Sequence, residues 1–126
     1  MVMAKFPILS SRNHLLPRAS FLPIRTIQRA ILETVVQLPS GRTLRVSSTH
    51  LDHLSSSLRV EQCRAILALH REGPLQGNVE HGPHPDPLWH EDVMPPPLPD
   101  DHLVAGDFNM ETAMPEYTAM VGDPHR

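Results

Sequence analysis

The chain contains few of the residues that several functional classes require. Cys63 is the only cysteine among 126 residues, which excludes a disulfide within the chain and a cysteine-based zinc site. Aromatic residues make up only 4% of the sequence, which is a poor basis for a surface that stacks nucleic-acid bases. The formal net charge is −3, so the sequence lacks the basic excess of proteins that bind nucleic acid tightly without sequence preference.

Long apolar runs are also lacking, and no segment is apolar for long enough to cross a membrane. The amino end has neither the charged head nor the apolar centre of a signal peptide. We therefore expect a soluble protein, cytoplasmic by default, with one domain over residues 1–126. A strand predicted to begin at residue 2 indicates that an earlier part of the domain is absent.

The clearest structural pattern is a β-hairpin. Residues 28–38 are rich in apolar and β-branched types, and Pro39-Ser-Gly-Arg42 is typical of a turn. Residues 43–49 then alternate between polar and apolar side chains, which predicts a second strand. That strand is followed at once by His50, Leu51, Asp52 and His53, so we expect polar groups at its end.

Around the hairpin the predictions are simpler. Residues 2–9 predict a strand interrupted by Pro7, and residues 10–27 predict a surface loop. Residues 58–71 predict a helix that follows serine N-cap candidates and stops at Gly73-Pro74. Its expected apolar stripe contains Val60, Cys63, Leu67 and His70.

Residues 73–101 are dense in proline and predict a long surface loop. Several histidines lie in or next to it, which raises the alternative of a histidine-rich metal-binding module. The spacing of His81, His84, His90 and His102 fits no compact ligand geometry, so this alternative ranks last.

The most informative stretch is Gly106-Asp-Phe-Asn109, which follows the apolar run 103–105. The run predicts a strand buried on both faces, and Gly106 would let another backbone or a ligand approach closely. On an extended chain, Asp107 and Asn109 would point to the same side. A short helix is expected over residues 112–120, with Pro115 in its first turn.

We expect this acid–amide pair and His50 to converge on one pocket at neighbouring strand ends. Asp107 is suited to orient and deprotonate a water molecule or to contact Mg²⁺, which prefers oxygen ligands. Asn109 is suited to hydrogen-bond a phosphate or the water, and His50 to donate to a phosphate oxygen. The simpler interpretation is that Asp107 and Asn109 cap the helix or turn that follows and that His50 is structural.

Three motifs in this order resemble the endonuclease/exonuclease/phosphatase superfamily: Phe6-Pro-Ile8, Thr49-His-Leu51 and Gly106-Asp-Phe-Asn109. The resemblance implies an α/β fold, part of a four-layered α/β sandwich with a mostly antiparallel or mixed sheet and flanking helices. It also implies hydrolysis of phosphoesters with Mg²⁺ or Mn²⁺. The substrate stays open among nucleic acid, a lipid head group and a small phosphate ester, as does phosphomonoesterase against phosphodiesterase activity, and no obligate protein partner is evident.

By this resemblance, Asp107 corresponds to the aspartate that orients the water and Asn109 to its partner asparagine. His50 corresponds to the histidine that contacts the phosphate, and Arg29 to a phosphate-facing basic residue. Asp107 is also the single metal ligand that the chain offers, the others being absent.

Asp52 and His53 are expected beside the site, where Asp52 would hold an imidazole or lie in a solvated loop. The family's early asparagine and glutamate, and its final Asp-His pair, have no counterparts, since Asp123-Pro-His125 does not reproduce the pair. The chain therefore resembles an internal fragment lacking both ends of the domain, and we expect it to be weakly active or inactive alone. The alternative from another class is a catalytically dead fragment that serves as a binding module.

Overall fold

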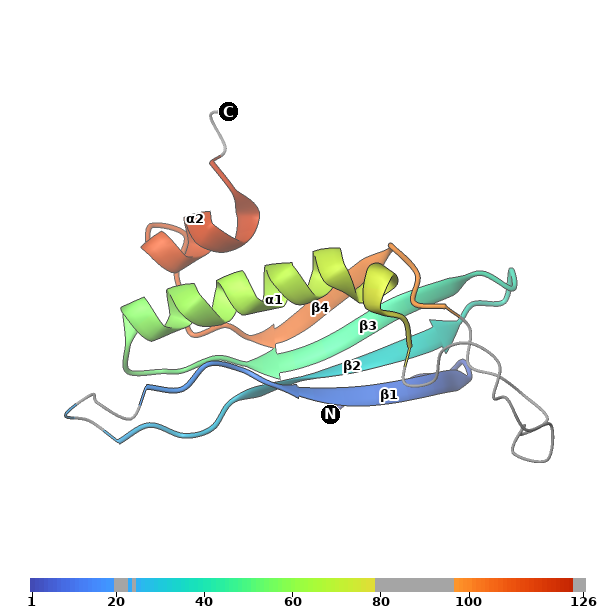
Figure 1. Cartoon of the computed structure of the whole chain (residues 1–126), viewed down its shortest axis with the longest axis horizontal. Coiled ribbons are helices and arrows are strands. Elements are labelled where there is room, and N and C mark those ends of the chain that lie inside the picture. The colour runs from blue at the N-terminus through green and yellow to red at the C-terminus, as the bar shows by residue number, and fades with distance from the viewer. Residues whose placement is uncertain (20–22, 24, 79–96, 124–126) are drawn as a thin grey trace.

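The computed structural model describes residues 1–19, 23, 25–78 and 97–123. Its elements form one mixed sheet with two helices (Figure 1). In chain order they are β1 (Ile8–Leu15), β2 (Ala30–Gln37), β3 (Thr43–His50), α1 (Ser56–Gln76), β4 (His102–Asp107) and α2 (Pro115–Val121). The predicted α/β class is confirmed. Among the described residues, neither helix combines the length and the apolar character that crossing a membrane requires.

The sheet has the strand order β1-β2-β3-β4. The first two pairings are antiparallel, whereas β3 and β4 are parallel. Parallel neighbours need a crossover connection, and α1 lies within it. Because of this crossover, the carboxyl ends of β3 and β4 meet at the same end of the sheet.

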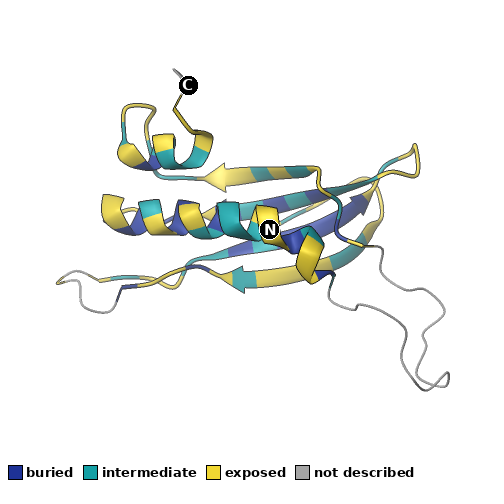
Figure 2. Ribbon diagram, turned by 45° about the horizontal axis from the view of Figure 1, so that its top comes forward, coloured by how far each residue is buried: buried dark blue, intermediate teal, exposed yellow. Residues whose placement is uncertain are grey.

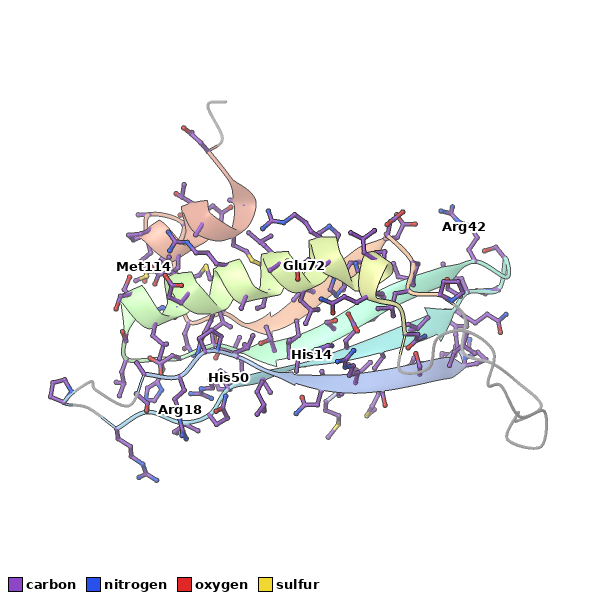
Figure 3. All side chains as sticks on the ribbon, in the orientation of Figure 1. His14, Arg18, Arg42, His50, Glu72 and Met114 are labelled. Atoms are coloured by element: carbon purple, nitrogen blue, oxygen red, sulfur yellow. The ribbon has the colours of Figure 1, made fainter. Side chains whose placement is uncertain are left out.

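The predicted hairpin is confirmed as β2 and β3. Its turn is closed by the Leu38 amide, which donates to the Arg42 carbonyl at 2.8 Å, and by the Gly41 amide, which donates to the Leu38 carbonyl at 2.9 Å. Gly41 has a φ of 85°, a conformation that glycine adopts without strain. Figure 3 shows Arg42 and His50 at opposite ends of the hairpin's second strand.

The prediction for the first 27 residues is wrong in its boundaries. The strand covers Ile8–Leu15, most of which was predicted as loop. Its centre is polar, and five of its eight residues are exposed, because β1 lies at the edge of the sheet. An edge strand whose side chains meet solvent needs no apolar alternation, so the pattern that reveals buried strands is absent here.

Helix α1 is capped by one of the predicted serines, begins at Ser56, two residues before the predicted start, and ends later than predicted. The Ser55 hydroxyl accepts a hydrogen bond from the Leu58 amide at 3.2 Å, which is an N-cap. The helix then continues through Gly73-Pro74 to Gln76, so the predicted stop is wrong. Pro74 has no amide to donate to the His70 carbonyl, and Nη2 of Arg45 donates to that carbonyl instead, at 2.8 Å.

The buried face of α1 differs from the predicted stripe. Cys63 is fully buried, as predicted, but Val60 and Leu67 are only half-buried and His70 is exposed. The buried positions are instead Leu58, Arg59, Gln62, Cys63, Ile66 and Gly73. Two of these are polar, which a stripe defined by apolar residues alone misses.

The core lies between the sheet and the helices and is centred on buried Leu16, Ile31, Leu51, Cys63 and Ile66. Partly buried Val104, Phe108, Met110 and Met120 pack against these residues. Figure 2 shows the buried residues concentrated on the central strands and the exposed ones on the outer side of α1. Burial raises the pKa of the Cys63 thiol, which keeps it protonated within this core.

A second set of buried residues under α1 is charged. Arg45 Nη1 lies 3.3 Å from Glu33 Oε2, and the other carboxylate oxygen lies 3.3 Å from His14 Nε2. Arg45 Nη2 also lies 3.2 Å from Nδ1 of His70. A Cβ on Gly73 would lie 2.5 Å from Arg45 Nη1, so glycine leaves room there for the guanidinium.

The last strand of the sheet, β4, is not buried on both faces as predicted. Leu103 is 52% exposed and Ala105 is also exposed, whereas Val104 packs toward the core. Residues 103–105 place apolar side chains on both faces of β4, although β4 is an edge strand with β3 as its one neighbour within the described sheet. The pattern identified a strand but not its position in the sheet.

The predicted loop 73–101 is only partly described. Residues 73–76 are helical, which corrects its start, and Leu98 is buried beside Gly73. Residues 79–96 lie outside the described part of the chain, as do the three histidines at 81, 84 and 90 that raised the alternative of a metal-binding module. Helix α2 begins at Pro115, its first-turn residue as predicted, three residues later than expected.

Candidate functional site

The site residues lie where β3 and β4 end side by side. His50 and Asp107 are directly paired in the parallel register, and Nε2 of His50 lies 3.7 Å from Oδ2 of Asp107. Their side chains are 54% and 64% exposed. An imidazole and a carboxylate thus meet at the surface, open to a ligand from solvent.

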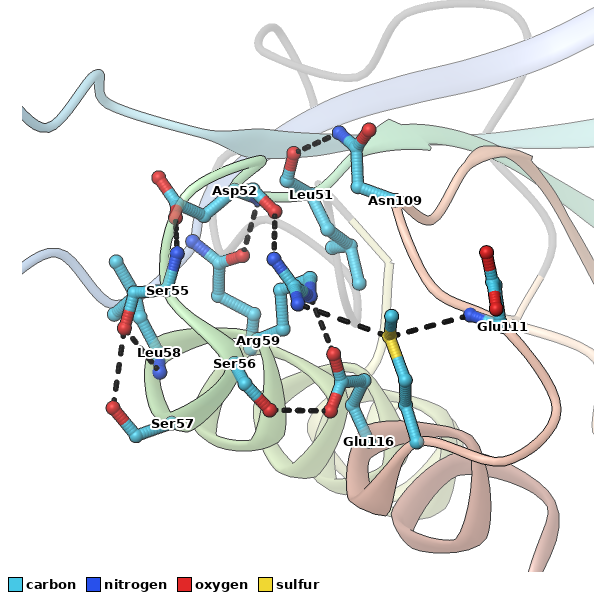
Figure 4. Close-up of polar contacts among 12 residues, drawn as sticks. Leu51, Asp52, Ser55, Ser56, Ser57, Leu58, Arg59, Asn109, Glu111 and Glu116 are labelled. Atoms are coloured by element: carbon cyan, nitrogen blue, oxygen red, sulfur yellow. Dashed lines mark hydrogen bonds and ion pairs between the residues drawn. The ribbon is translucent and has the colours of Figure 1, made fainter.

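Asn109 reaches the same place by a turn, not by the extended alternation that the sequence predicted. Its φ is 49°, the left-handed conformation that asparagine tolerates better than most residues. Its backbone amide donates to Oδ1 of Asp107 at 2.9 Å. Its side-chain Nδ2 donates to the Leu51 carbonyl at 2.9 Å (Figure 4). Asn109 therefore links the end of β4 to the residue that follows His50.

Gly106 makes this arrangement possible. Its φ is 149°, and a Cβ at this position would overlap the carbonyl oxygen of Thr49. The expected close approach of another backbone is confirmed, and that backbone is β3. The Leu51 amide continues the contact by donating to the Asp107 carbonyl at 3.0 Å.

The three residues do not line one pocket, which corrects the expectation of a shared pocket, although the His50 ring lies 3.7 Å from the Asp107 carboxylate. Asp107 and Asn109 line a groove of about 1510 Å³ between α1, β4 and α2, with Phe108 and Met110 on its apolar wall. His50 lines a separate hollow of about 410 Å³ with Asn13 and others. Arg45 contacts α1, and strand side chains alternate, so His50, five residues later, points to the face of the sheet away from α1, where it meets the side chain of Asp107, its partner in the register.

The residue after Leu51 is buried, so the expectation of a solvated loop is wrong for Asp52. Its side chain is held by backbone amides, since Oδ2 accepts from Leu54 at 2.9 Å and from Ser55 at 2.7 Å. Its own amide donates to Oε1 of Gln62 at 2.9 Å. Asp52 thus shapes the turn from β3 into α1, by hydrogen bonds to amides and not to an imidazole.

Arg29 and His53 form a pair beside the site. Nη2 of Arg29 lies 3.2 Å from Nδ1 of His53, which is exposed. Arg29 stands immediately before β2, on the strand that pairs with β3, so its cation lies near the same end of the sheet. Its Nε is buried without a hydrogen-bond partner among the described residues.

Beneath the site lies a hydrogen-bonded group of residues to which the sequence analysis assigned no role. Nε of Arg59 donates to Oε1 of Glu116 at 2.6 Å, and Nη1 donates to the Asp52 carbonyl at 3.2 Å. The hydroxyl of Ser56 donates to the second oxygen of Glu116 at 2.7 Å. The sequence did carry one indication of their burial. Arg59 and Gln62 lie on the same helix face as the core residues Cys63 and Ile66.

Glu116 is fully buried and nevertheless stays ionised. Burial alone raises the pKa of its carboxyl, but hydrogen bonds from Ser56, from its own backbone amide and from Arg59, together with the Arg59 charge, outweigh that effect and lower the pKa. The carboxylate and the guanidinium therefore form a charged pair inside the protein.

The donor set near Asp107 fits only a loosely held metal ion. The described residues contain no group of three His, Cys, Asp or Glu side chains placed to hold one. What they offer to a hard cation is the exposed Asp107 carboxylate and the side-chain oxygen of Asn109. Mg²⁺ is often held by one or two carboxylates together with water and substrate phosphate, and this set is compatible with that mode.

Comparison with solved structures shows that the sheet and its helices have the fold of endonuclease/exonuclease/phosphatase proteins. No protein-family profile and no curated protein matches the chain. One similar structure is an endonuclease/exonuclease/phosphatase family protein from Bacteroides thetaiotaomicron, with a TM-score of 0.63, 19% identity and 93% of this chain covered.

Two further structures agree on the fold. The mannosyl-6-phosphatase of Bacteroides thetaiotaomicron has a TM-score of 0.61 at 20% identity over 93% of this chain. The human Nocturnin catalytic domain with a bound sulfate anion has a TM-score of 0.56 at 20% identity over 90% of this chain. The match covers 36%, 38% and 34% of the three solved chains, so this chain spans about a third of their length.

Proposed function

We propose that the strand-end site serves metal-assisted hydrolysis of a phosphoester, with His50, Asp107 and Asn109 as its catalytic groups. The observation that carries the proposal is the 3.7 Å approach of His50 to Asp107 at the paired ends of β3 and β4. Asn109 is tied to both strands at this point. The fold shared with phosphoester-cleaving neighbours supports the same chemistry.

The roles follow from the chemistry of each group. Asp107 would orient the attacking water and accept its proton. His50 would donate a hydrogen bond to a non-bridging phosphate oxygen, where negative charge develops. Nδ2 of Asn109 is already bonded to Leu51, so its carbonyl oxygen would be the atom that positions the water.

Arg29 extends the site toward the substrate. Its guanidinium, beside His53, would neutralise a second phosphate oxygen at the same end of the sheet. When bound at Asp107, Mg²⁺ or Mn²⁺ would supply positive charge to the phosphate and favour ionisation of the water. The substrate class is a phosphoester from nucleic acid, a lipid head group or a small phosphate.

The direct test is hydrolysis of a chromogenic phosphodiester by the purified chain with Mg²⁺. The expected rate is low, and Asp107→Asn should lower it by roughly 100-fold or more, as removal of a general base does. Asp101→Asn changes an exposed aspartate that pairs with Arg42 and should leave the rate unchanged. Turnover that survives Asp107→Ala would contradict the proposal.

A second candidate is a module that binds a phosphate group without cleaving it. It is favoured by the absence, within the described residues, of three acidic or histidine side chains gathered around a metal position. It predicts that inorganic phosphate shifts the NMR signals of His50 and Arg29 while no hydrolysis occurs. Measurable hydrolysis that depends on Asp107 would exclude it.

A further inference from the structure

The two segments that follow the site residues are joined by a buried connection through α1. The first segment follows His50, and its Asp52 carbonyl accepts a hydrogen bond from Arg59 Nη1 at 3.2 Å. The second follows Asn109 and leads into α2, where Glu116 accepts from Arg59 Nε at 2.6 Å. One guanidinium thus contacts the elements that follow each half of the site, as Figure 4 shows.

The connection is rigid on both sides of Arg59. Ser56, one turn earlier on α1, donates to the second oxygen of Glu116 at 2.7 Å, so both carboxylate oxygens are held. Gln62, one turn later, accepts from the Asp52 amide at 2.9 Å and donates to the Pro17 carbonyl at 3.1 Å. The side chains of Arg59 and Glu116 are 7% and 0% exposed, so water does not compete for these bonds.

We propose that Arg59 is a positioning residue that, with Glu116, holds the loop after His50 against α2 and thereby keeps His50 in its position relative to Asp107 and Asn109. The inference rests on the proposed function of those three residues. Arg59 touches neither the substrate position nor the metal position and acts through the Asp52 carbonyl and α2. The strand ends are also joined directly, by Asn109 Nδ2 to the Leu51 carbonyl, and Arg59 adds the contact between the loop after β3 and α2.

The geometry requires arginine, not only a positive charge. The guanidinium directs Nε toward Glu116 and Nη1 toward Asp52, in two different directions from one rigid plane. The ammonium of lysine is a single point that would retain the ion pair with Glu116 but lose the second contact. Arg59→Lys therefore keeps the positive charge beside Glu116 and removes the hydrogen bond to the Asp52 carbonyl.

The test compares Arg59→Lys with a matched control on the same helix. Arg64 also pairs with a glutamate, Nη1 to Oε1 of Glu61 at 2.6 Å, but both side chains are more than half exposed. The measurements are the NMR signals of the His50 ring and the Asn109 side-chain amide in the full chain, followed by kcat and KM with a phosphodiester. Arg59→Lys should shift both signals and lower kcat by about 100-fold with KM little changed, because small misplacements of reacting groups have effects of that size.

Arg64→Lys should leave the signals and the rates as they are. If Arg59→Lys folds and its His50 and Asn109 signals match the wild type, the positioning role is overturned, even if the variant is less stable. If the variant does not fold, Ser56→Ala provides the test, since it removes one bond to Glu116 from an exposed residue. It should shift the same two signals by a smaller amount, and unchanged signals would again overturn the inference.

The NMR readout also keeps this inference separate from the proposed function. If the wild-type chain does not hydrolyse phosphoesters but Arg59→Lys shifts the His50 and Asn109 signals, the positioning role stands and the hydrolase proposal fails. If the chain is active and Arg59→Lys changes neither signals nor kcat, the hydrolase proposal stands and the positioning role fails.

Discussion

Arg45 on β3 and Glu33 on β2 form an ion pair beneath α1, with 3.3 Å between Nη1 and Oε2 and side chains 0% and 4% exposed. A buried pair of this kind adds little net stability while it is intact, because both charges lose their hydration. Its energetic importance lies in what happens when one partner is removed. The remaining charge is then buried without compensation.

Glu33→Ala should therefore destabilise the fold by about 3–5 kcal/mol. The free energy of unfolding in urea measures the effect. Asp101→Ala is the matched control, since it removes the acid of an exposed pair with Arg42, whose side chains are 64% and 74% exposed. Asp101→Ala should lower the free energy of unfolding by at most about 1 kcal/mol. Equal losses in the two variants would show that burial of the ion pair does not determine its importance for stability.

Gly106→Ala should disrupt the strand pairing at the site. The new Cβ would overlap the carbonyl oxygen of Thr49, which is a backbone atom of the paired strand and cannot rotate away. Gly41 also has a positive φ, but a Cβ there would meet open space. Gly41→Ala should cost about 1–2 kcal/mol from backbone strain alone, and Gly106→Ala should cost more and remove the NMR contact between His50 and Asp107.

The stability of the chain should fall as His102 becomes protonated in the unfolded state. Burial, followed by the charges of Arg45 and His70, lowers the pKa of the His102 ring from 6.5 to about 4. Its Nε2 lies 2.7 Å from the Ser47 hydroxyl. Between pH 6.5 and pH 4 the unfolded chain binds a proton that the folded chain does not, so this residue's contribution is complete above pH 6.5 and is lost as the pH falls toward 4.

Urea midpoints between pH 7.5 and pH 4 test this directly. His102→Gln should weaken the decline in stability over that range. His53→Gln, at an exposed histidine, should keep the wild-type slope. A wild-type slope in His102→Gln would show that the decline has another source.

The edge strand β4 should promote self-association. Leu103 is 52% exposed on a strand that has only β3 as its neighbour in the described sheet. Leu103→Lys should shift the chain toward monomer in size-exclusion chromatography. Leu75→Lys changes a more exposed leucine, 88% exposed on α1, and should have less effect if the strand edge is responsible.

Much of the sheet was predictable because its buried strands carry local signals. The hairpin followed from β-branched runs on either side of a Pro-Ser-Gly turn, and Gly106 indicated the close backbone approach that Thr49 makes. The bounds of β1 were predicted wrongly because a polar edge strand has no apolar period. The end of α1 was predicted wrongly because Arg45, on β3, donates to the His70 carbonyl in place of the amide that Pro74 lacks. A contact from a distant strand leaves no signal in the sequence of the helix.

In the candidate site, too, some features have local sequence signals and others depend on residues distant in the sequence. The proximity of His50 and Asp107 could be expected from two polar strand ends, whereas the turn at Asn109 and the two separate hollows depend on tertiary contacts. Arg59 and Glu116 were not assigned because charged residues are rarely fully buried. Their burial is explicable only once each is seen as the other's partner, 57 positions apart.

The parallel pairing of β3 with β4 has a kinetic consequence. Asn109 bonds to the carbonyl of Leu51 across 58 positions, whereas the hairpin strands β2 and β3 are joined by a short turn. Contacts between distant positions form slowly, because the intervening segment must lose its freedom before the contact forms. During refolding the β2–β3 hairpin should therefore form first. The pairing of β4 with β3, which brings Asp107 next to His50, should form later.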